Sequence, residues 1–201
     1  MDALEDVADL EWLRGEDGGL RLNLHRPPGQ RLSRVHLKIV KAGDPIAISD
    51  LLPMMENFGL RALSERPWRI SPPGLPAGAS IQDFEFEHTG GATLQIERIE
   101  ERFGQAFLAA WRGEVENDGF NRLLLQTELD ARQIVVLRAC CRYLLQTGIP
   151  FSQAYMERVL AGNAAGFTIT VTSDGVGTAT GVVLTDNLPG NAALGVNWTI
   201  S

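Results

Sequence analysis

The side chains best suited to chemistry in this sequence are three histidines and two cysteines. His25, His36 and His88 are far apart in the sequence and lack the spacing of a helical metal-binding pair. His36 and His88 fall on or just after predicted strands, so we expect them at the surface or at a sheet edge, and no metal site is predicted. Cys140 and Cys141 are adjacent in a helical stretch, point to different faces and are poorly placed to bond to each other. Reduced core thiols are expected, as in a cytoplasmic protein.

A glycine-rich run near the C-terminus has the composition of a nucleotide-binding loop. Gly175, Gly177 and Gly181 follow an apolar stretch, but a dinucleotide site requires a helix to begin among its glycines. The residues after Gly181 are β-branched, and Asp174-Gly175 is typical of a hairpin turn. We therefore predict strands here and no nucleotide site.

Residues 114–121 (EVENDGFN) gather acids, amides and an aromatic side chain between two predicted helices. A ligand contact or an interface is one interpretation. We favour a turn between helices in which Asn117 or Asp118 caps free N–H groups and Phe120 inserts into the core. No Ser-His-Asp or Cys-His arrangement can be assembled, so no catalytic residue is predicted.

The composition limits the classes of function. The chain has 201 residues, 18 basic and 25 acidic side chains and a formal net charge of −7. Nucleic-acid binders need a basic face, so the charge argues against that class. No apolar run is long enough for a membrane span, and the acidic N-terminus is unlike a signal peptide. After Arg158 the sequence lacks Lys, Arg and Glu, and from Phe167 it is rich in Thr, Gly and Val. Two unrelated pieces therefore join near residues 162–164.

Periodicity predicts the elements of the first piece. Ser49 as the N-cap and Gly59 as the C′ residue bracket a short helix. In a further strand, Phe84 and Phe86 are expected to point inward. Helix-period or alternating patterns place helices at about 2–14, 50–58 and 94–112, and strands at 20–25, 35–39, 60–70 and 81–87.

This order predicts an α+β fold with the βαββα core of an ACT-like or ferredoxin-like domain. We expect a largely antiparallel four-stranded sheet with two helices on one face, residues 20–25 supplying the fourth strand. A helical segment and a short β-hairpin tail follow. The predicted divisions are 1–113 (ACT-like domain), 114–163 (helical segment) and 164–201 (partial β-repeat tail).

Residues 31–160 resemble part of the large bacterial NAD-specific glutamate dehydrogenases. The strings that carry the resemblance are VHLKIVKAGDPIAISDLLPMMENFGLRALSERPWRI (35–70), AFLAAWRGEVENDGFNRLLL (106–125) and RACCRYLLQTGIPFSQAYMERVL (138–160). The resemblance implies a segment upstream of the catalytic domain, where an ACT-like module passes into a helical region that serves assembly and regulation. No position matches a catalytic or NAD-binding residue of the family, so NAD is expected only in the parent enzyme. Expected partners are other parts of a homo-oligomeric dehydrogenase.

Two alternatives remain open. ACT-like modules often hold amino acids in the loop between the first core strand and its helix, here residues 41–49. Gly43 would permit close approach of the backbone, and Ser49 and Asp50 would offer polar groups. An amino-acid effector is thus one interpretation of the loop, although we favour a plain β–α connection. Residues 167–201 resemble a Thr-rich repeat of bacterial surface proteins, which would make the chain a surface-repeat fragment or a composite reading frame.

Overall fold

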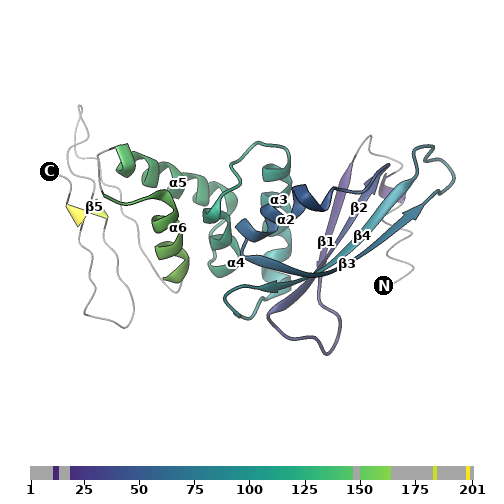
Figure 1. Ribbon diagram of the computed structural model, residues 1–201, viewed down its shortest axis with the longest axis horizontal. Helices are drawn as coiled ribbons and strands as arrows, with labels where there is room; N and C mark the ends of the chain where they lie inside the picture. Colours follow the sequence, from purple (N-terminus) through teal and green to yellow (C-terminus); the bar gives the residue numbers. More distant parts are fainter. Residues whose placement is uncertain (1–10, 14–18, 147–149, 164–182, 185–197, 200–201) are drawn as a thin grey trace. The chain divides into compact units, whose positions relative to one another are not determined.

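The computed structural model describes residues 11–13, 19–146, 150–163, 183–184 and 198–199 (Figure 1). The chain divides into two compact units, residues 1–140 and 141–201. The boundaries predicted after residues 113 and 163 stay predictions. Within the described residues, no helix combines the length and the apolar character that crossing a bilayer requires.

The first unit is built on a four-stranded antiparallel sheet with the order β1-β2-β4-β3. Its strands are β1 (Leu20–His25), β2 (Arg34–Ala42), β3 (Leu60–Ile70) and β4 (Ala79–His88). All four strands were predicted, including residues 20–25 as the fourth strand, and the structure places that strand beside β2. β1 and β2 form one hairpin and β3 and β4 another, and the two hairpins meet at the central β2–β4 pair.

β3 lies at one edge of the sheet and departs from regular pairing. The register shifts between Ala62 and Ser64, which leaves Leu63 as an extra residue in a bulge. Pro67 also lies in β3, where it is opposite Gln82 of β4. Since proline lacks an N–H group, an edge strand is the place in a sheet where it is tolerated.

Helices α2 (Ile48–Asn57) and α3 (Ile96–Trp111) pack on one face of this sheet, α2 against β3 and α3 against β1 (Figure 1). Alternating positions of β2 and β4 face them, as predicted for Phe84 and Phe86, which are 1% and 0% exposed. Phe58 and Phe103 meet edge to face with ring centroids 5.2 Å apart. The fold class is α+β, with an ACT-like core.

The start of α2 differs from the prediction. Its N-cap is Ala47, which makes no side-chain cap, and Ser49 lies inside the helix with its hydroxyl 3.2 Å from Asp50 Oδ1. The cause lies just before the helix, where the Gln82 side chain binds both the N–H and the C=O of Ile46 at 2.8 and 3.0 Å. Residue 46 is thereby held outside the helix, and the chain turns into α2 directly after it. The predicted end is confirmed, since Gly59 follows the C-cap with φ +81°.

Beyond α3 the chain is helical. η1 (Gly119–Arg122) and α4 (Leu123–Gln126) lead into α5 (Ala131–Gln146). Asp130 and Gln133 form a capping box, each side chain accepting from the other's backbone N–H. In the second unit, α6 (Gln153–Gly162) is capped by Ser152, whose hydroxyl accepts from Tyr155 N.

The second unit also contains β5 (Val183–Leu184) and β6 (Trp198–Thr199), which pair antiparallel. The rest of the predicted tail, including Gly175, Gly177 and Gly181, lies outside the described residues. The helix predicted at 2–14 is described only at residues 11–13, which are helical.

Candidate functional site

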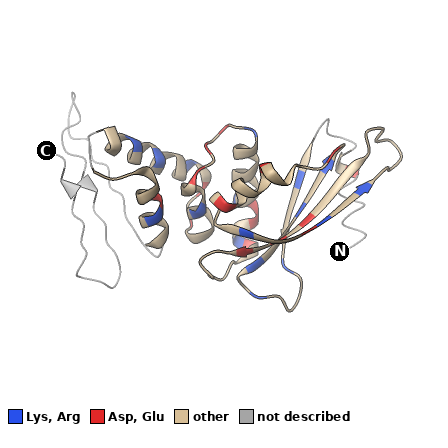
Figure 2. Cartoon of the chain, in the orientation of Figure 1, with Lys and Arg blue, Asp and Glu red and all other residues tan. Residues whose placement is uncertain are grey.

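The sheet face opposite the helices carries two kinds of side chain. At one end, Leu13, Val40 and Ile81 form an apolar cluster with Trp12 and Trp68 packed against it. At the other end, ion pairs cross the strands: Arg34 to Glu85 at 2.8 Å and Arg61 to Glu87 at 2.8 Å. Figure 2 shows acidic and basic residues interleaved along these strands. We call the polar part of this sheet face, which carries Arg34, Arg61, Glu85 and Glu87, the charged face.

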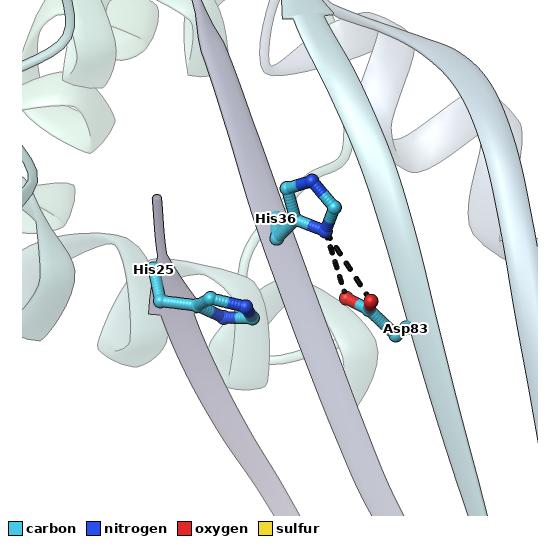
Figure 3. Close-up of side chains that lie close together, drawn as sticks. All are labelled: His25, His36 and Asp83. Atoms are coloured by element: carbon cyan, nitrogen blue, oxygen red, sulfur yellow. Dashed lines mark hydrogen bonds and ion pairs between the residues drawn. The ribbon is translucent and has the colours of Figure 1, made fainter. Parts of the chain in front are cut away.

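Two histidines and an aspartate converge on the charged face from three neighbouring strands (Figure 3). His25 on β1 lies directly opposite His36 on β2, with ring centroids 5.3 Å apart. His36 Nδ1 is 3.2 and 3.3 Å from the two carboxylate oxygens of Asp83 on β4. Antiparallel pairing places directly opposite and diagonal neighbours within side-chain reach, so the sheet register builds this cluster.

The cluster is largely shielded from water. Side chains of His36 and Asp83 are 8% and 13% exposed. His36 Nδ1 donates to Asp83, which leaves Nε2 to accept from the Gln30 amide nitrogen at 3.3 Å. Burial lowers the pKa of His25, although the Asp83 carboxylate acts in the opposite direction. His25 is therefore a neutral imidazole with a ring lone pair at pH 7.

The structure corrects our prediction for two histidines. His36 lies on an inner strand and is 7% exposed, and His88 at the end of β4 is 2% exposed, so neither is a surface residue. We had taken the separation of the histidines in the sequence as evidence that they are apart in space. The β1–β2 hairpin instead places residues 25 and 36 directly opposite each other. His88 is separate from the cluster: its Nδ1 accepts from Ala92 N at 3.2 Å, and burial lowers its pKa.

The predicted ligand loop lies elsewhere, between β2 and α2. Gly43 has φ +75° with open space where a Cβ would be, and its N–H donates to Gly78 O at 2.9 Å. Ser49 and Asp50 are exposed and adjacent on the first turn of α2. Both therefore face solvent at a helix start. The binding of an amino acid there stays a prediction.

A third polar group joins α5 to the turn before it. The Arg138 side chain is 4% exposed. Two of its nitrogens donate to the Asp118 carboxylate at 2.7 and 2.9 Å, and one of them also donates to Asn121 Oδ1 at 3.0 Å. Asp118 caps η1 through Phe120 N, and Phe120 is fully buried, as the turn interpretation predicted. Sequence reasoning missed Arg138. The acidic stretch that contains Asp118, 20 residues earlier in the chain, was the available signal, since a buried arginine needs such partners.

Comparison with known proteins matches the chain to two neighbouring parts of one enzyme. Residues 19–99 match the profile of the glutamate dehydrogenase ACT3 domain, and residues 115–168 match glutamate dehydrogenase helical motif 3. Residues 19–99 and 115–168 therefore correspond to two parts of the glutamate dehydrogenase family. The first match ends at residue 99, in the first turn of α3, and the second begins at residue 115, between α3 and η1.

Full-length relatives give the same family. The segment is similar to the NAD-specific glutamate dehydrogenases of Halomonas elongata (39% identity over 159 residues), Pseudomonas aeruginosa (36% over 158) and Mycobacterium tuberculosis (34% over 167). These alignments cover 77–79% of this chain and 10% of each relative. The chain thus spans about a tenth of the length of the curated relatives it matches. The predicted resemblance of 167–201 to a surface-protein repeat has no support among these matches.

Proposed function

We propose that this chain is a non-catalytic regulatory and assembly segment of a homo-oligomeric NAD-specific glutamate dehydrogenase. The observation that carries the proposal is the joint match to the ACT3 domain and helical motif 3, in that order along one chain. NAD and glutamate would bind to the catalytic part of the parent enzyme, and no residue of this chain is assigned to either.

The described side chains support a structural role. The apolar groups of β2 and β4 are used in packing against α2 and α3, and Arg138 is used in fixing η1 to α5. The charged face, in contrast, presents ion pairs such as Arg61–Glu87, in which the Arg61 side chain is 66% exposed. Exposed charges of this kind select a partner surface by complementarity more than they add affinity. Another segment of the dehydrogenase is the partner we propose.

The test uses the Halomonas elongata enzyme with its matching segment deleted. The purified chain alone should show no glutamate-dependent reduction of NAD, followed by absorbance of NADH. Added in trans to the deleted enzyme, it should co-elute on size exclusion and raise activity. An Arg61→Glu variant, which reverses one exposed charge, is expected to bind more weakly and with an altered salt dependence. Glutamate-dependent turnover by the chain alone would refute the non-catalytic role, and failure to associate would refute the assembly role.

An amino-acid effector at Gly43, Ser49 and Asp50 and a cytoplasmic location remain predictions within this proposal. The regulatory role does not depend on either of them. The composite-reading-frame and surface-fragment alternatives are not carried further, since helical motif 3 matches across the predicted junction to residue 168.

A further inference from the structure

We propose that His25, His36 and Asp83 bind one divalent transition-metal ion, with Zn²⁺ as the best fit. One ligand atom from each of the three side chains lies within 4.8 Å of the other two. Zinc bonds to nitrogen and oxygen at about 2.0–2.2 Å, so tetrahedral ligand atoms lie about 3.4 Å apart. The His36 Nδ1 to Asp83 Oδ1 distance of 3.2 Å already matches this spacing.

Among the three ligands, the His25 ring is the one that has to turn to complete the site. It lies on the edge strand β1, and its buried Nδ1 has no hydrogen-bond partner among the described residues. A neutral imidazole offers a ring lone pair of this kind to a metal ion.

Gln30 supplies the support that a metal-bound histidine needs. When Nδ1 of His36 binds metal, its proton moves to Nε2, which then requires an acceptor. The Gln30 amide nitrogen is 3.3 Å from Nε2, and its Oε1 is buried without a partner among the described residues. A half-turn of the amide places this oxygen against Nε2–H, where it can accept. The amide orientation is interchangeable in this way because the two ends of the group have the same shape.

The three ligands determine which class of metal ion binds best and how many coordination positions stay open. Two imidazoles and one carboxylate suit Zn²⁺ and its transition-metal neighbours, whereas Mg²⁺ and Ca²⁺ prefer oxygen ligands. Three protein ligands leave the fourth zinc position for water or a small ligand. This proposal departs from the sequence prediction of no metal site, which rested on sequence spacing alone.

The surrounding charges set the affinity. Lys38, 4% exposed, lies opposite Asp83 in the register, and Arg66 flanks Asp83 from β3. A cation beside the site opposes a second cation by Coulomb repulsion, strongly where water is excluded. Glu85, opposite His36, is already paired with Arg34. Replacing Lys38 by methionine should therefore tighten metal binding.

The experiment is titration of the untagged full chain with Zn²⁺ by calorimetry, with Co²⁺ absorption as a spectroscopic readout. We expect one equivalent to bind, a visible Co²⁺ band without thiolate charge transfer, and a rise in the thermal midpoint through linkage. His25→Gln and Asp83→Asn should each weaken binding more than ten-fold. Gln30→Ala should weaken it by about ten-fold, as loss of an outer-shell partner does, and Lys38→Met should tighten it.

Two matched controls decide the location of the metal. His88→Asn removes a buried histidine outside the cluster and should leave Zn²⁺ affinity unchanged. The double variant Cys140→Ser/Cys141→Ser should also bind normally. The proposal is overturned if the folded chain takes up no Zn²⁺, if His25→Gln and Asp83→Asn bind as the unaltered chain does, or if the cysteine variant alone loses binding.

Discussion

Replacing Arg138 by methionine is expected to destabilise the first unit by about 3 kcal/mol. Methionine keeps much of the side-chain volume and removes the guanidinium. The change therefore deletes the two bonds to Asp118 and the bond to Asn121 while leaving the packing beside Phe120 largely filled.

The size of this loss of stability follows from the Asp118 carboxylate that is left without its partner. Removing one partner of a buried ion pair costs about 3–5 kcal/mol because the other charge stays buried and uncompensated. The Asp118 side chain is 16% exposed and still accepts from Phe120 N, which moderates the loss. We therefore expect the lower end of that range.

Urea unfolding followed by circular dichroism measures the effect. With a denaturant slope of about 2 kcal/mol/M, the midpoint should fall by about 1.5 M. Arg132 is exposed on the same helix, so Arg132→Met is the matched control and should change stability by less than about 0.5 kcal/mol. Adding Asp118→Asn to Arg138→Met should recover part of the loss, since the orphaned charge is gone. A midpoint for Arg138→Met equal to that of Arg132→Met would refute the reasoning.

Three further predictions concern other parts of the chain. Burial lowers the pKa of His88 below its usual 6.5, so the unfolded state binds more protons between that lowered value and 6.5. Stability should fall as pH falls through this window, and the slope measured by thermal unfolding should be shallower in His88→Asn, which keeps an acceptor for Ala92 N. Truncation after Asn163 should leave the first unit's stability unchanged, and a loss above about 2 kcal/mol would show that the tail is integral. Calorimetric titration with a panel of amino acids decides whether residues 41–49 hold an effector: binding there predicts heat that Ser49→Ala/Asp50→Asn abolishes, and flat traces at millimolar concentration would end the effector interpretation.

The sheet and its helices were predictable because their signals are local. Alternation in β1 and β4 and the helical spacing of α3 each arise from one element with one buried face. Gly59 was found because a left-handed C′ residue is nearly always glycine. Such signals survive without knowledge of what packs where, so the element order and the α+β class followed from them.

The candidate site was not predictable in the same way. The His25–His36–Asp83 cluster depends on the registers of two strand pairs, and a shift of one residue would move a side chain to the other face. Ser49 was misassigned as a cap because Gln82, distant in sequence, fixes where α2 begins. Lys38 and Arg138 are buried charges, which composition-based reasoning places at the surface.

The irregular edge of β3 has a consequence for the behaviour of the chain at high concentration. A free strand edge can pair with the edge of another molecule and start aggregation. In β3 the bulge at Leu63 interrupts the hydrogen-bonding ladder, Pro67 removes a donor, and Arg66 places charge along the strand. Any sheet continued from this side would lose its register within a few residues. The same features that make β3 a poor strand by propensity thus oppose association through this edge of the sheet.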